Sequence, residues 1–201
     1  MTGIASKILA RIRRAGRDSR IFSAKDFLSL GSRAAVDTAL SRLFKAGSIR
    51  RVRRGLYDLP RHSALLKVAV PPNIDAVAKA VGAVAADSIA AANGLGLTTA
   101  VSVRPIYLTA GPSRTVTTGK TAIELRHAPG WLLAFAGTSA MPFVQALYWL
   151  GRDGAAAAVG KLKAKITLDV ARALRRHPVV GWLAEVVRDL TAGVGPSHEG
   201  C

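Results

Sequence analysis

Cysteine is almost absent from this chain of 201 residues, and the single one, Cys201, is its last residue. One thiol cannot form an internal disulfide or provide the several thiolates of a cysteine-based zinc site. The four histidines, His62, His127, His177 and His198, match no metal-binding spacing. We therefore expect no metal and no cofactor, and a reducing, cytoplasmic location.

Acidic side chains are also scarce, with 12 Asp and Glu against 29 Lys and Arg and a formal net charge of +17. No pair of carboxylates suggests general acid–base catalysis, and no serine stands in the sequence context of an activated nucleophile. We therefore expect no catalytic residues, and a protein that is not an enzyme.

Long apolar runs are few, but residues 131–150 form a stretch of twenty without a charge. Such a stretch is long enough to cross a bilayer. Gly137 and Pro142 interrupt it, however, and Ser139 is placed to cap a new helix. We predict a buried strand followed by a core helix, and no membrane association. The N-terminus has arginines where a secretory signal needs its apolar run, so no export signal is expected.

Positive charge is concentrated in the N-terminal third of the chain. Residues 1–70 hold 16 Lys and Arg with 4 Asp and Glu, whereas residues 71–201 hold 13 and 8. A segment this cationic attracts polyanions, of which nucleic acid is the commonest.

Pro71 and Pro72 mark a domain boundary, because proline disfavours a helix before it. The predicted organisation is a DNA-binding domain over 1–70, an α/β domain over 71–192 and a disordered tail over 193–201.

Three helices are expected before residue 47, because apolar residues recur at helical spacing behind residues that cap helices. The first places Ile4, Ile8, Leu9 and Ile12 on one face, with Thr2 as its candidate cap. The second has Ser23 and Asp26 as a capping box, with Phe22 and Phe27 as a hydrophobic staple. The third has Ser32 as its cap, the stripe Val36, Leu40, Leu43 and Phe44, and Gly47 as its end.

The opposite face of this third helix carries side chains of the kinds that reach base edges and phosphates. They are Ser32, Arg33, Thr38, Ser41, Arg42 and Lys45. The stretch "IRRVRRGLYDLP" follows, in which Gly55 permits a tight hairpin turn and Arg50, Arg51, Arg53 and Arg54 are expected to stay in solvent. Helix and hairpin together predict a winged helix-turn-helix. The alternatives are an ordinary helical pair with a polar outer face and a hairpin whose arginines protect its edges.

The second part of the chain predicts a small mixed α/β domain. Short helices are expected at 73–84 and 87–97, strands at 104–111, 114–118 and 122–128, and C-terminal helices at 141–150, 155–165, 168–175 and 179–190. The whole chain is thus predicted as α+β. Arg114, Lys120 and Arg126 could form a second basic patch on the strands, although solvated strand faces are the simpler explanation.

Three stretches carry a family resemblance: "GSRAAVDTALSRLFKAGSIRRVRRGLYDLP", "AANGLGLTT" and "IYLTAGPSRTVTTGKTAIELRHAP". They resemble the AbiEi-type antitoxins, transcriptional regulators of type IV toxin–antitoxin systems. The chain departs from that family at Ala86, Asp87 and Ser88, where a proline and a glycine are usual. The resemblance implies a repressor of its own operon that binds double-stranded DNA at an inverted-repeat operator. It also implies that a nucleotidyltransferase-like toxin is counteracted without a stable complex.

An inverted repeat needs two copies of the DNA-binding module, supplied by a homodimer or by cooperative monomers. A second hypothesis belongs to a different functional class. The protein could be a protein-binding antitoxin or scaffold whose basic N-terminal module binds RNA or an acidic partner, since a fold alone does not decide function.

Overall fold

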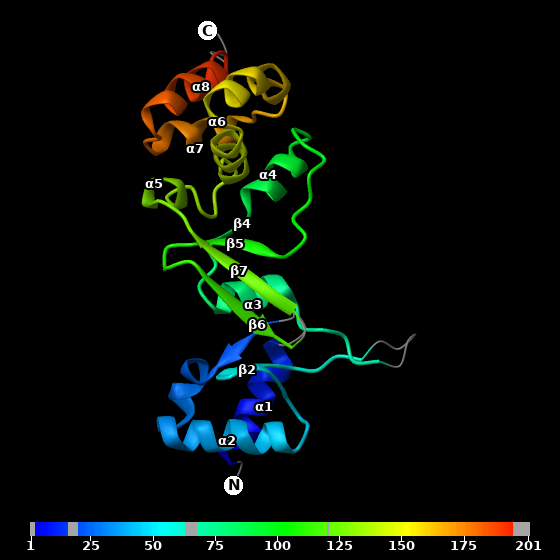
Figure 1. The fold of residues 1–201 in the computed structure, drawn as a ribbon. Coiled ribbons are helices and arrows are strands. Elements are labelled where there is room, and N and C mark those ends of the chain that lie inside the picture. The colour runs from blue at the N-terminus through cyan, green and yellow to red at the C-terminus, as the bar shows by residue number, and fades with distance from the viewer. Residues whose placement is uncertain (1–2, 16–19, 63–67, 120, 195–201) are drawn as a thin grey trace. The chain divides into compact units, whose positions relative to one another are not determined.

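The computed structural model describes residues 3–15, 20–62, 68–119 and 121–194, and these form a mixed α+β protein with two sheets (Figure 1). The chain divides into two compact units. The first comprises Met1–Gly82 and Thr115–Ile123, and the second Ala83–Arg114 and Glu124–Cys201. The division falls after Gly82, later than the boundary that the two prolines suggested. The first unit also takes in a distant segment of the chain.

The first unit is built around three helices, α1 (Ile4–Ala15), the 3-10 helix η2 (Ala24–Leu30) and α2 (Arg33–Lys45). Ile8, Ile12, Phe27 and Leu40 form the centre of its core and are fully buried. The predicted start of α2 is confirmed, because the Ser32 hydroxyl accepts a hydrogen bond from the Ala35 amide at 3.3 Å. Thr2, the predicted cap of α1, lies outside the described residues.

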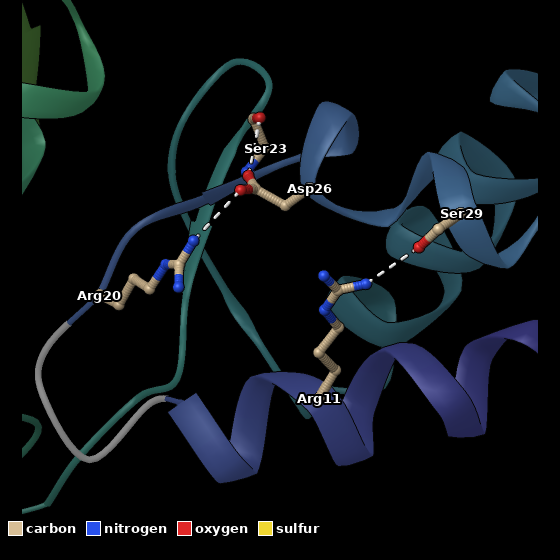
Figure 2. A network of polar contacts seen from close by, with 5 residues as sticks. All are labelled: Arg11, Arg20, Ser23, Asp26 and Ser29. Carbon is tan, nitrogen blue, oxygen red and sulfur yellow. Dashed lines mark hydrogen bonds and ion pairs between the residues drawn. The ribbon is translucent and has the colours of Figure 1, made fainter.

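Local chemistry explains both the C-terminal end of α2 and the start of η2. Gly47 has a φ of 68°, a left-handed conformation that ends α2 as expected. At the start of η2, Asp26 accepts hydrogen bonds from the Ser23 amide at 2.7 Å and the Ser23 hydroxyl at 2.9 Å (Figure 2). The rings of Phe22 and Phe27 stack with centroids 5.8 Å apart, as the staple predicts. The capping residues were correct, although the element they start is a 3-10 helix.

The sheet of the first unit has three short antiparallel strands in the order β1-β3-β2. They are β1 (Phe22–Ser23), β2 (Arg50–Arg53) and β3 (Leu56–Asp58). The turn between β2 and β3 contains Gly55, whose φ of 78° suits glycine. The predicted hairpin is therefore present. A further helix, α3 (Ile74–Ala80), begins where the Asn73 side chain accepts from the Ala76 amide at 3.0 Å.

The second sheet has the order β4-β5-β7-β6. Its strands are β4 (Ala85–Ala86), β5 (Ile106–Thr109), β6 (Arg114–Thr118) and β7 (Thr121–His127). β5 pairs with β7 in parallel and with β4 antiparallel. Residues 115–123, the tip of the β6–β7 hairpin, are the distant segment that is grouped with the first unit.

The described residues of the second unit also form the helices α4 (Ser88–Gly94), α5 (Gly130–Leu133), α6 (Met141–Lys163), α7 (Leu168–Arg176) and α8 (Gly181–Thr191). Its apolar core includes Phe135, Leu147, Leu162 and Leu183, all fully buried. Gly151 has a φ of 71° inside α6 and divides it close to the predicted gap between two helices. Residues 195–201 of the predicted tail lie outside the described residues.

The apolar run 131–150 is the clearest correction to the predicted elements. Its first part forms the short helix α5, where a buried strand was predicted, and Ala140 stands at the N-cap of α6 in place of Ser139. Short apolar segments fit a buried strand and a buried helix equally well, so their pattern cannot separate the two. Across the described parts of the chain, we find no helix with the length and apolarity needed to cross a membrane.

The core of the first unit predicts a sharp contrast between two adjacent residues. Phe27 is fully buried, whereas Leu28 is 47% exposed. Phe27→Ala should lower the stability of this unit by about 3–5 kcal/mol, because it leaves a cavity. Leu28→Ala, the matched control, should change it by less than about 0.5 kcal/mol. Native-state hydrogen exchange of α1 and α2 in the full chain measures both, and equal effects would contradict this assignment of the core.

Candidate functional site

The outer face of α2 presents most of the predicted contact residues to solvent. Its exposed polar residues are Arg33, Asp37, Thr38, Ser41, Arg42 and Lys45, while Val36, Ala39, Leu40 and Leu43 are buried. Ala34 is exposed on the same helix and leaves room beside the polar side chains. Ser32 is exposed too, but its hydroxyl is engaged in capping the helix.

The cations of α2 differ in whether they have a partner. Arg33 Nε lies 2.8 Å from Asp37 Oδ2, an ion pair one helical turn apart with both side chains more than half exposed. Exposed pairs of this kind contribute little to stability, so an anionic ligand can replace Asp37 at low cost. For Arg42 and Lys45 we find no side-chain partner among the described residues.

The β2–β3 hairpin displays three further cations. Arg51, Arg53 and Arg54 are exposed, and within the described parts of the chain their side chains form no ion pair or hydrogen bond. Val52, between the first two, is buried at 7% exposure. The strand therefore turns its valine inward and leaves its neighbouring guanidinium groups in solvent.

Arg50 does not stay in solvent, so the prediction that all four arginines of the hairpin are solvated is wrong for this residue. Its Nε donates to Asp58 Oδ1 at 2.9 Å and its second terminal nitrogen to Asp58 Oδ2. Asp58 is only 6% exposed, and Arg50 also donates to the Val70 carbonyl at 2.6 Å. The two residues face each other on the β2–β3 ladder. A buried carboxylate needs such a partner, which explains why this arginine is withdrawn.

The helix and the hairpin are attached to one core. Buried residues of α1, η2 and α2 pack in the same cluster as Phe22 of β1 and Ile49, which directly precedes β2. The link from α2 to β2 is short, and its Ser48 amide donates to the Leu43 carbonyl at 3.0 Å. The free cations of α2 and of the hairpin therefore belong to one compact body.

The second predicted basic patch receives less support from the structure. Lys120 lies outside the described residues. Arg126 Nε donates to Glu124 Oε1 at 2.7 Å, and this carboxylate raises the pKa of Arg126 above its ordinary value. Arg114 donates to the Pro112 carbonyl at 3.3 Å. Glu124 thus offsets the charge of Arg126.

Sequence reasoning missed a basic groove along α1. The groove has a volume of about 810 Å³ and is lined by Lys7, Ala10, Arg11, Arg14, Ala15 and Leu30. Arg11 is held in place by a 3.1 Å hydrogen bond to the Ser29 hydroxyl (Figure 2). The spacing of the cations at positions 7, 11 and 14 places them on one helical face, and this pattern could have revealed the groove.

These observations define a mixed α+β protein with a compact, strongly basic N-terminal unit. Residues 7–172 match the family model described as "Family of unknown function (DUF6088)", and the chain belongs to that family. The match spans segments of both compact units. Comparison with curated proteins and with solved structures gave no match.

The two ion pairs of the first unit should differ in their effect on stability. Asp58→Ala leaves the largely buried Arg50 guanidinium without its counter-charge and should lower the free energy of unfolding by about 2 kcal/mol. Asp37→Ala removes the exposed pair with Arg33 and should cost less than about 0.5 kcal/mol. Hydrogen exchange of the β2–β3 amides measures the difference. A larger effect of Asp37→Ala would overturn this ranking.

Proposed function

We propose that this protein is a sequence-specific DNA-binding transcriptional repressor that acts as the antitoxin of a type IV toxin–antitoxin system. Its N-terminal unit serves as a winged helix-turn-helix, in which α2 is the recognition helix and the β2–β3 hairpin is the wing. The observation that carries the proposal is a set of exposed cations on these two elements for which the described part of the chain offers no side-chain partner. They are Arg42, Lys45, Arg51, Arg53 and Arg54, all fixed to one core.

The helix provides the discrimination between DNA sequences. The major groove of B-DNA is about 12 Å wide and accepts an α-helix. The short side chains Thr38 and Ser41 on the exposed face of α2 allow close approach to base edges. Arg42, which is free of a protein partner among the described residues, can bind the O6 and N7 atoms of guanine with both arms of its guanidinium. Arg33 joins it once Asp37 is displaced.

The hairpin provides affinity that does not depend on sequence. Arg51, Arg53 and Arg54 each reach a phosphate of the flanking backbone and release its condensed counterions. The three together account for a log–log salt slope of about −2.7, at about 0.9 per phosphate. Arg50 contacts no phosphate in this proposal. It supports binding indirectly, because its ion pair with Asp58 holds β2 against β3.

The biological role comes from the resemblance to the AbiEi antitoxins. As in that family, the protein represses its own operon at an inverted repeat in the cytoplasm and counteracts a nucleotidyltransferase-like toxin. The deciding experiment is a gel shift with the DNA upstream of its own gene, compared with random duplex DNA and RNA of equal length. Binding at least a hundredfold tighter to the upstream DNA supports the proposal, and equal binding to all three removes it.

Substitutions on the helix and the hairpin should have separable effects. Arg53→Ala or Arg54→Ala should weaken binding to every duplex alike and reduce the salt slope by about 0.9. Arg42→Ala should reduce the preference for the operator by about 1–3 kcal/mol. Arg13→Ala, which removes the same charge from α1, is the control and should alter neither preference nor slope appreciably. Binding isotherms over a salt series report all three quantities, and identical behaviour of the helix and hairpin variants would refute the division of roles.

A second candidate function draws on the groove along α1. Three cations over a floor of Ala10, Ala15 and Leu30 suit an acidic, partly apolar segment of a protein better than a bare phosphate chain. In this case the basic unit is a docking module for an acidic partner. Lys7→Ala with Arg14→Ala would then abolish the antitoxin effect in cells that express the neighbouring toxin gene, while operator binding would persist.

A further inference from the structure

Strand β2 contains an irregularity between two of the free arginines. Arg51 lies opposite Tyr57 and Arg53 opposite Leu56, so Val52 has no partner on β3. Such a bulge interrupts the ladder, bends the strand and redirects neighbouring side chains. β2 is also an edge strand, because the sheet order is β1-β3-β2. The conformation of this part of the wing therefore depends on contacts from outside the sheet.

The missing contact comes from a threonine 66 residues further along the chain. Thr118 Oγ1 donates a hydrogen bond to the Val52 carbonyl at 3.0 Å, and the bond is buried. Thr118 ends β6 and is 4% exposed. It belongs to the tip of the β6–β7 hairpin, residues 115–123, which is part of the same compact unit as β2.

The β6–β7 hairpin has buried residues in both of its strands. Val116 and Ile123, on either side of its turn, are 1% and 0% exposed. Thr118 is β-branched, so its χ1 angle is restricted in a strand. The Thr118 hydroxyl therefore has a well-defined position. It can fix the Val52 carbonyl more closely than a donor on a mobile side chain could.

We propose that Thr118 is a positioning residue for the arginines of the wing. By fixing the Val52 peptide at the bulge, its hydroxyl sets the direction in which Arg51 and Arg53 leave the strand. This inference rests on the proposed function, because the direction of these side chains matters only when both must meet phosphates. Without the hydrogen bond, the strand must be ordered upon binding, and the cost of ordering lowers affinity.

The hydroxyl can be tested separately from the shape of the residue. Thr118→Val keeps the volume and the β-branch but cannot donate, and it should weaken binding to duplex DNA about fivefold. The loss should be equal for operator and random duplex, with the operator preference set by α2 unchanged. Thr118→Ser retains the donor and should bind within about twofold of the wild type. Thr117→Val, the same change at an exposed neighbour, is the control and should have no effect.

The measurements are fluorescence anisotropy with both duplexes and hydrogen exchange of residues 50–58 in the full chain. We expect the amides of residues 50–58 to exchange faster in Thr118→Val than in the wild type, alongside the loss of affinity. In Thr118→Ser their exchange should return to the wild-type rate. If Thr118→Val does not fold, Thr118→Ala also removes the donor and takes its place with the same expectation.

The outcomes separate this inference from the proposed function. A wild-type protein that binds no duplex removes the proposed function, and the inference with it. A wild-type protein that binds the operator while Thr118→Val binds equally well overturns the inference alone. A loss confined to the operator, with random duplex unaffected, would likewise overturn it, because such a loss would point to the recognition helix.

Discussion

The ion pair between Arg50 and Asp58 is the interaction on which the basic unit depends. It joins β2 to β3, and the same guanidinium reaches the Val70 carbonyl, so one side chain ties together three stretches of chain. Asp58 is buried, and a buried carboxylate without a partner would be strongly unfavourable. Such pairs add little net stability when complete, but the loss of one partner is strongly destabilising. One arginine is thus withdrawn from solvent, and the register it fixes allows three others to face outward.

The distribution of charge constrains the molecule in a second way. Residues 1–70 carry 16 cationic and 4 anionic side chains, and their mutual repulsion opposes compaction. Local carboxylates relieve part of this repulsion, as Asp26 does for Arg20 and Asp37 for Arg33. The cations of the β2–β3 turn have no such relief among the described residues. A polyanion that binds there removes repulsion as well as adding contacts, and it therefore stabilises the folded unit.

Sequence reasoning succeeded where a few neighbouring residues decide the structure. Ser32, Asp26, Gly47 and Gly55 act within their own turns, and each behaves as its residue type predicts. It failed where the decision is made by tertiary packing, as in the apolar segment that became α5. The two-residue strands β1 and β4 are too short to leave a pattern. For the candidate site, the exposed residues of α2 were identified correctly, but nothing local distinguishes Arg50 from the arginines beside it.

The contact between Thr118 and Val52 joins two stretches of chain that lie 66 residues apart in the sequence. The compact unit that carries the β2–β3 hairpin is not one continuous stretch, because it includes residues 115–123. A fragment ending at residue 70 would retain α2, the hairpin and the Arg50–Asp58 pair but would lack the donor to the Val52 carbonyl. An edge strand with a bulge has no internal means of holding that carbonyl. The geometry of the β2–β3 hairpin is therefore a property of the longer chain, because a hairpin encoded in the second half of the sequence contacts a strand encoded in the first.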